Sequence, residues 1–471
     1  MKVAIKTPVG MTKRESIFNV ITQGDVFGPI LCSNQVDTFG KECLEEGRYN
    51  YSYKGEVDIP PLGMVDDLVC VAECGPKTAM VNAYINQKTS SKKLQFGASK
   101  CKKLHVGLTR EEHKCQDLGV ENWAEVELTN DETGDIEVQD LYKGEVKIDE
   151  TNEEKYLGDV ISSDGRNIKN IKARLAKGKG IVSNIISKLE GIPFGKHFFE
   201  VGVLLRDSLL VSSVLFNAEA WYNLTAAELD LIETVDMSLL KQILNAPRGT
   251  PKEMVYLELG CLPFREIIRE KRLRFLHYIL NSDQNSLVHK FFNTQMKHKT
   301  KKDWVTTVLE DLKVLDLEHL SMEEIRIMKK TCFTNLIKQN IQLYAFKNLE
   351  DLKKSHSKVE KVQHCVLKIQ KYLQPNSIKM RKEDAQLIFR LRCRMTQLKV
   401  NLKGKYDTLE CSACGIEEEN QQHVIFCKEI NEKRSMENIK YENIFNGTVE
   451  EKLKIAKLFK ENFDKLENMK K

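Results

Sequence analysis

Features that would place the chain in a membrane or outside the cell are absent from the sequence. No run of about 18 apolar residues occurs, which argues against a helix that spans a bilayer. Met1 is followed by Lys2 and a mixed stretch without an apolar core, so no signal peptide is visible. We therefore expect an intracellular protein, in the cytoplasm or the nucleus, that is not secreted and has no membrane partner.

A large excess of one charge sign is also lacking. A net charge of +5 over 471 residues permits a nucleic-acid partner without requiring one. The 13 cysteines, without a secretory signal, favour reduced thiols or a bound metal over a disulfide framework. The length is enough for about two to four domains.

A pair of adjacent aspartates, Asp66 and Asp67, lies between two apolar runs. Residues 62–65 precede the pair and residues 68–71 follow it, which predicts a β-hairpin with the acidic pair at its tip. Two neighbouring carboxylates repel each other unless a cation lies between them, and Mg²⁺ prefers such oxygen ligands. The alternative is a solvated turn, because aspartate is common in turns.

Motifs on both sides of this pair follow a characteristic order. A loop with Gln23-Gly24 leads to Gly28-Pro29 and a helix; then come Met64-Val65-Asp66-Asp67, Lys100 and Tyr156-Leu157-Gly158. This order resembles the palm of the reverse transcriptases of non-LTR retrotransposons, with Val65 where that family usually has alanine.

The resemblance implies an RNA-directed DNA polymerase that works by two-metal nucleotidyl transfer. Asp66 and Asp67 would hold Mg²⁺ or Mn²⁺, and Lys100 would assist the leaving pyrophosphate. Gln23, Gly24, Gly28 and Pro29 would shape the nucleotide and template site, and Tyr156, Leu157 and Gly158 would form the primer grip. The implied partners are an RNA template, a DNA primer and, for an active enzyme, deoxynucleoside triphosphates.

One carboxylate of such a site is missing from the sequence. The family places a further aspartate on a strand before the Gln-Gly motif, whereas Glu15 is the only acidic residue among residues 1–22. We therefore expect the C-terminal portion of an N-terminally truncated polymerase, inactive as this single chain. The alternative is a non-catalytic RNA- or nucleic-acid-binding protein derived from such an element.

A second chemical motif lies near the C-terminus. Cys411, Cys414, His423 and Cys427 have the spacing Cys-x2-Cys-x8-His-x3-Cys. Three thiolates and an imidazole at these intervals predict a tetrahedral Zn²⁺ site, a zinc knuckle. The alternative is buried cysteines in a helical domain. Just upstream, Arg390 and Arg394 lie beside the apolar stripe of a predicted helix, and we expect them to contact nucleic acid.

The fold expected from these patterns is α+β, in five parts. A partial reverse-transcriptase palm, a β-hairpin-bearing α/β sandwich, covers 1–165 with an acidic insert at about 108–155. A helical thumb-like domain covers 166–296. A helical connector covers 297–380, a basic helix plus zinc knuckle 381–430, and a helical tail 431–471.

Two further expectations concern the helices. In the thumb-like domain, Arg269 and Arg272 lie on a basic helix face that either contacts phosphates or is simply solvated. Serine or threonine three residues before glutamate predicts capping boxes that begin at Thr225, Thr250, Ser321 and Thr448.

Overall fold

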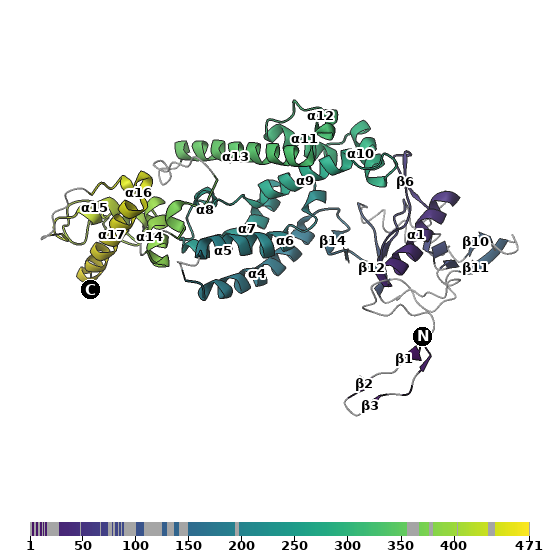
Figure 1. Cartoon of the computed structure of the whole chain (residues 1–471), viewed down its shortest axis with the longest axis horizontal. Helices are drawn as coiled ribbons and strands as arrows, with labels where there is room; N and C mark the ends of the chain where they lie inside the picture. Colours follow the sequence, from purple (N-terminus) through teal and green to yellow (C-terminus); the bar gives the residue numbers. More distant parts are fainter. Residues whose placement is uncertain are drawn as a thin grey trace. The chain divides into compact units, whose positions relative to one another are not determined.

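The computed structural model describes most of the chain. The longer described stretches are 28–47, 49–65, 67–73, 100–107, 149–193, 197–355, 367–375, 380–402, 404–431 and 439–470. Shorter ones are 2–3, 6–7, 10–11, 13, 15–16, 78, 81–82, 84–85, 87–88, 125–129 and 136–140. Helices and small sheets are both present, which confirms the α+β class (Figure 1). Two compact units result, Met1–Lys169 with Ser282–His298, and Asn170–Asn281 with Lys299–Lys471.

The first unit contains short strand pairs and helices (Figure 1). Its antiparallel pairs are β1 (Lys2–Val3) with β4 (Glu15–Ser16), β2 (Lys6–Thr7) with β3 (Gly10–Met11), β5 (Tyr51–Tyr53) with β6 (Val57–Ile59), β7 (Leu62–Met64) with β8 (Asp67–Val69), β10 (Glu125–Thr129) with β11 (Ile136–Asp140), and β13 (Glu153–Tyr156) with β14 (Asp159–Ser162). β9 (Lys102–Leu104) and β12 (Asp149–Thr151) pair in parallel. Its helices include α1 (Gly28–Glu46) and α10 (Leu287–Lys297).

A small apolar core holds the β7–β8 hairpin on α1. Leu68 and Cys70 pack against the buried residues Cys43, Tyr49, Val81, Tyr84 and Ile85. The rings of Tyr49 and Tyr84 stack with centroids 4.1 Å apart, and the Tyr84 hydroxyl donates a hydrogen bond to Glu46 at 2.8 Å. Because this core combines α1, β8 and the helical residues near 81–85, the hairpin packs against two helical segments.

The helix α10 completes the first unit by packing on the β5–β6 hairpin. The Tyr53 and Phe291 rings are 4.4 Å apart, and the Glu56 carboxylate pairs with Lys297 and, at 2.7 Å, with His298. These contacts group α10 with the first unit, whereas the sequence-based boundary at residue 296 placed it in the thumb-like domain.

The second unit is almost entirely helical. Its helices are α4 (Ile168–Glu190, whose first two residues fall in the first unit), α5 (Phe198–Leu205), the π-helix η3 (Arg206–Val211), α6 (Ser212–Val214), η4 (Ala218–Ala220), α7 (Ala226–Leu244), α8 (Lys252–Leu259), α9 (Phe264–Leu280), α11 (Trp304–Val314), α12 (Met322–Ile327), α13 (Lys330–Ser355), η5 (Lys371–Leu373), α14 (Lys382–Arg392), η6 (Lys399–Asn401), α15 (Gln421–Phe426), α16 (Asn443–Asn446) and α17 (Val449–Met469). Among the described helices of the chain, none is both long and apolar enough to cross a membrane.

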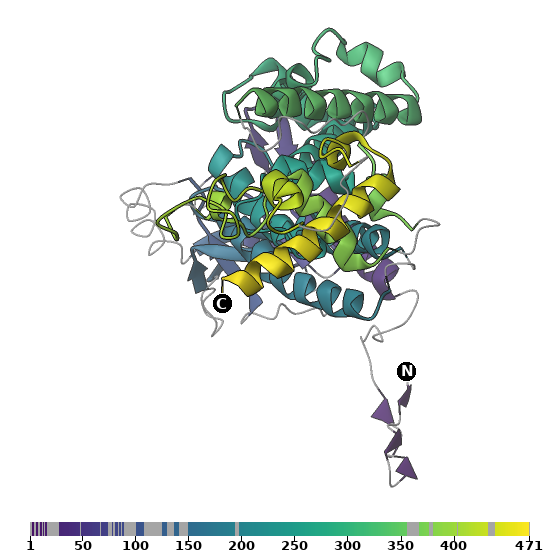
Figure 2. The same cartoon turned by 90° about the vertical axis from the view of Figure 1, so that its left-hand side faces the viewer.

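One apolar core runs through most of the second unit, from Ile171 to Leu466. It joins the buried stripe of α4 to α7, α8, α14, α15 and α17, and α17 packs directly on α14 and α15. Figure 2 shows α17 as the yellow helix that ends at the C-terminal mark. The parts named thumb, basic helix, knuckle and tail in the sequence therefore share a single core.

The capping predictions are confirmed at three of four positions. Thr225, Ser321 and Thr448 each cap a helix in a complete capping box. The prediction at Thr250 is wrong, because α8 begins after Pro251 without a side-chain cap. The Thr250 hydroxyl is instead buried without a hydrogen-bond partner among the described residues.

Candidate metal centre and nucleic-acid interface

Cys411, Cys414, His423 and Cys427 come together at one point of the second unit. Their ligand atoms all lie within 4.8 Å of one another, and Cys414 Sγ is 3.4 Å from His423 Nε2. Three sulfur ligands and one imidazole nitrogen at this separation can hold a metal ion such as zinc. The grouping expected from the sequence spacing is therefore confirmed.

Local backbone geometry explains how these four ligands converge. Gly415 has φ 64°, which favours glycine, and its N–H donates to the carbonyl of Cys411 at 2.8 Å. The side chain of Asn420 caps α15 by accepting the N–H of His423 at 2.9 Å. This cap fixes His423 in the first turn of α15, while the turn at Gly415 brings the first two cysteines together.

A hydrogen bond from outside the ligand set orients the imidazole. Glu417 Oε2 lies 3.1 Å from His423 Nδ1, so His423 Nε2 is the nitrogen that faces Cys414. Metal-binding histidines commonly donate the N–H of their second ring nitrogen to a carboxylate in this way, which fixes the tautomer. The arrangement suits a histidine that binds a metal through Nε2.

The thiols differ in acidity before any metal binds. Burial disfavours the thiolate of Cys414, but hydrogen bonds from the backbone N–H groups of Glu417 and Ile416 and from the side chains of His423 and Cys411 together lower its pKa to about 7. Burial raises the pKa of Cys427 to about 11. Because a metal requires thiolates, its binding releases the protons that these thiols carry in the metal-free chain.

The metal-ligand cluster is supported by α17. Asn462, fully buried in α17, donates to the carbonyls of Val424 at 2.9 Å and Ile425 at 3.1 Å. Lys470 reaches the buried carboxylate of Glu419 at 2.9 Å. Sequence reasoning missed these supports; the Asn-x-x-His pattern at Asn420 is a readable capping signal, whereas nothing in the sequence singles out Asn462.

The β7–β8 hairpin presents the second candidate site. Asp66 lies outside the described residues, as do Gln23 and Gly24, while Gly28 and Pro29 open α1. Asp67 is exposed at the start of β8, opposite Met64. Val65 at the turn has φ 58°, a left-handed conformation that costs energy for a β-branched residue.

The predicted primer-grip turn lies near this hairpin. Leu157 and Gly158 both have positive φ, 46° and 89°, and close the β13–β14 hairpin. Burial, together with the nearby Asp67 charge and Cys70, raises the pKa of Tyr156. Tyr156 therefore lies within electrostatic range of Asp67, while Lys100 is exposed just before β9.

Arg269 and Arg272, the arginines predicted on a basic helix face of the thumb-like domain, pair with carboxylates within the second unit. Arg272 makes two hydrogen bonds to Asp311, at 2.7 and 2.9 Å, and its side chain is 7% exposed. Arg269 pairs with Glu266 and, at 3.0 Å, with Asp311. Because both guanidinium groups are satisfied by buried carboxylates, this geometry argues against phosphate contact at either position.

Arg390 and Arg394 lie upstream of the metal-ligand cluster. Burial lowers the pKa of Arg390. The guanidinium group of Arg394 lies 6.0 Å from the centre of the Phe445 ring. Between them, Arg392 is buried and pairs with Glu258 at 2.9 Å. The Tyr372 hydroxyl donates to the same carboxylate at 2.6 Å. This network ties α8 to α14.

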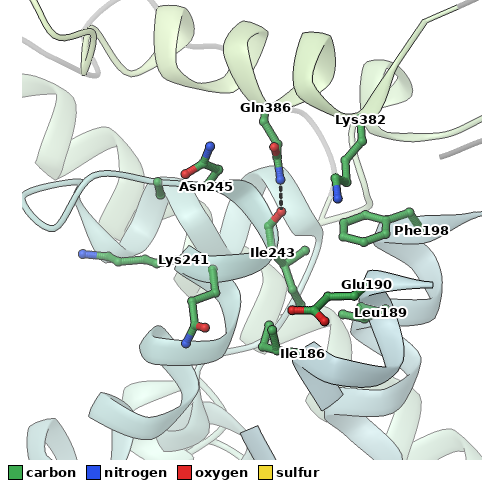
Figure 3. A pocket seen from close by; sticks show the side chains of 11 residues that line it. Ile186, Leu189, Glu190, Phe198, Lys241, Ile243, Asn245, Lys382 and Gln386 are labelled. Carbon is green, nitrogen blue, oxygen red and sulfur yellow. Dashed lines mark hydrogen bonds between the residues drawn. The ribbon is translucent and has the colours of Figure 1, made fainter. Parts of the chain in front are cut away.

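A cleft of about 350 Å³ lies between α4, α5, α7 and α14 (Figure 3). Gln386 donates to the carbonyl of Ile243 at 2.8 Å, and the Lys382 ammonium lies 5.0 Å from the Phe198 ring centre. Lys241 donates to the carbonyl of Arg248 at 2.7 Å. These polar side chains are engaged within the chain, and we assign no ligand to the cleft.

Comparisons with models of known protein families, with curated proteins and with solved structures found no match for this chain.

Proposed function

We propose that the chain is a polymerase portion of the reverse-transcriptase type, from a non-LTR retrotransposon. Asp66 and Asp67 would hold Mg²⁺ at the tip of the β7–β8 hairpin, where the metal would neutralise phosphate charge. Gln23, Gly24 and Lys100 would contact the nucleotide, and the turn at Tyr156 would contact the primer.

The observation that carries this proposal is the placement of the β7–β8 hairpin. It packs through Leu68 and Cys70 on α1 and the helical residues near 81–85, and it bears exposed Asp67 within electrostatic range of Tyr156. A carboxylate-bearing hairpin on helices, with a second hairpin next to it, is the arrangement that the motif order implies.

Metal binding at the hairpin is the direct test. We expect Mn²⁺, followed by electron paramagnetic resonance, to bind the full chain and to lose this site in Asp66→Asn/Asp67→Asn. Asp58→Asn, an exposed aspartate of β6, is the matched control and keeps the site. Mn²⁺ binding that is identical in the parent and the double variant contradicts the proposal.

Primer extension on an RNA template addresses catalysis separately. Two-metal transfer requires carboxylates from more than one segment, and residues 1–22 offer only Glu15. We therefore expect the single chain to bind metal without extending a primer. Extension that disappears in the double variant would still support the polymerase proposal, whereas extension that persists in it would contradict the assigned site.

A second candidate function is RNA binding without catalysis, and the metal-ligand cluster favours it. Zn²⁺ held by Cys411, Cys414, His423 and Cys427 would fix the segment around it for contact with single-stranded RNA. We expect zinc chelation and Cys411→Ser to weaken RNA binding, measured by fluorescence anisotropy. Cys332→Ser, at an exposed cysteine of α13, is the control. Equal binding by the chelated and zinc-loaded chains contradicts this function.

A further inference from the structure

Three lysine ammonium groups surround the ring of Tyr406, five residues before the first cysteine of the metal-ligand cluster. The Nζ atoms of Lys399 and Lys470 lie 5.9 Å from the ring centre, and that of Lys405 lies 6.0 Å from it. The lysines come from η6, from the segment after it and from the end of α17. Tyr406 is 36% exposed, so the ring remains accessible from solvent.

Two of these ammonium groups are held in place. Lys470 pairs with Glu419 and Glu467, each at 2.9 Å, and Lys399 donates to the backbone carbonyl of Glu410 at 2.8 Å. A carbonyl does not cancel the charge of Lys399, and among the described residues no carboxylate pairs with Lys399 or Lys405. Lys399 and Lys405 therefore present two ammonium groups without a described carboxylate partner beside the accessible ring of Tyr406.

Attraction to the ring does not account for this arrangement. Cation–π attraction at an exposed tyrosine is weak, and the ammonium groups of Lys399 and Lys405, which no described carboxylate neutralises, repel each other. An anionic ligand would relieve that repulsion. An accessible aromatic ring within a group of cations is the combination that binds unpaired nucleotides, because the base stacks on the ring and the phosphates meet the cations.

We propose that Tyr406, Lys399 and Lys405 form a contact site for single-stranded RNA. An unpaired base stacks on Tyr406, and the phosphates beside it contact the two lysines. Duplexes are disfavoured because their base faces are already stacked. The choice of RNA rests on the proposed function, and the site deepens it by naming a contact surface outside the metal ligands.

Binding of fluorescein-labelled oligouridine of about 10 nucleotides to the zinc-loaded full chain tests the site. We expect Tyr406→Ala to weaken binding about 5- to 100-fold, whereas Tyr406→Phe, which keeps the ring, stays within about 2-fold. Lys405→Ala lowers the slope of log affinity against log salt by about 0.7. The matched controls Tyr278→Ala and Lys460→Ala, both exposed positions of the second unit, leave affinity and slope unchanged.

The outcomes separate this inference from the proposed function. Parent-like affinity of Tyr406→Ala, with zinc content and helicity preserved, overturns the site while RNA binding stands. A parent chain that binds no RNA overturns RNA binding and the site together. Equal affinity for oligothymidine overturns the assignment to RNA, and equal affinity for duplex RNA overturns the stacking. A photocrosslink from 4-thiouridine RNA to Tyr406, mapped by mass spectrometry, supports the site.

Discussion

At the scale of single residues, several arginines of the second unit pair with buried carboxylates instead of facing solvent. Arg269 and Arg272 looked like a basic face because they recur at helical spacing, but their partner Asp311 lies about 40 residues further along. The partner of Arg392, Glu258, is 134 residues away in sequence. A helical pattern predicts which side chains share a face, but it carries no information about which distant helix covers that face.

Lys452 provides a prediction at this scale. Burial, reinforced by the nearby Arg392 charge, lowers the pKa of Lys452 to about 8. The folded chain then binds fewer protons than the unfolded chain between pH 8 and about 10.5, so stability rises with pH across this window. Below pH 8 Lys452 is charged in the folded chain, so the energetic cost of burying this charge is fully present. Lys452→Met should therefore stabilise the second unit there by about 1–3 kcal/mol.

Urea unfolding at pH 7 and pH 10 measures this effect. The gain from Lys452→Met should shrink at the higher pH, where the lysine of the folded chain is already neutral. Lys454→Met, at an exposed position of α17, is the control and should change stability little at either pH. An equal gain at both pH values would show that packing, not charge, is the cause.

At the scale of elements, the sequence predicted features whose residues are close together in the chain, but it did not predict packing between distant segments. The acidic hairpin and the metal-ligand spacing were predictable because their determinants lie within a few residues of each other, and three of the four capping boxes formed. The capping box at Thr250 failed because Pro251 itself became the N-cap of α8. The packing of α10 on β5–β6 depends on Glu56, more than 200 residues away in sequence, which no local pattern reveals.

Gly260 at the end of α8 gives a prediction at this scale. It has φ 65°, and a Cβ there would overlap the carbonyl carbon of Lys368 and lie 2.5 Å from the amide nitrogen of Ile369. Gly260→Ala should therefore destabilise the second unit by about 3–5 kcal/mol, from backbone strain plus displacement of the 368–369 segment.

The matched control is Gly404→Ala. Gly404 has φ 88°, but no atom of the described residues lies within 4 Å of a Cβ there, so this variant should show only the strain of about 1–2 kcal/mol. Thermal unfolding of both variants measures the difference. Equal losses of stability in the two variants would mean that the close approach of residues 368–369 to Gly260 does not contribute to the effect.

At the scale of the whole molecule, the metal-ligand cluster should stabilise one unit selectively. Cys411 and Cys427 belong to the same core as α14 and α17. We therefore expect zinc chelation to lower the unfolding temperature of the second unit and to leave that of the first unchanged. Calorimetry of the full chain with and without chelator measures this, with Cys411→Ser beside Cys332→Ser. A midpoint for the second unit that chelation does not shift would contradict a structural metal.

The core of the second unit also determines when this unit can fold during synthesis on the ribosome. Its buried residues extend from Ile171 to Leu466, so the helices of α4 and α7 leave the exit tunnel long before α17 is made. Until then their partners are absent and apolar faces stay open to chaperones and to neighbouring nascent chains. A message that stops translation before Val449 should therefore yield a product that is degraded rather than a shorter folded protein.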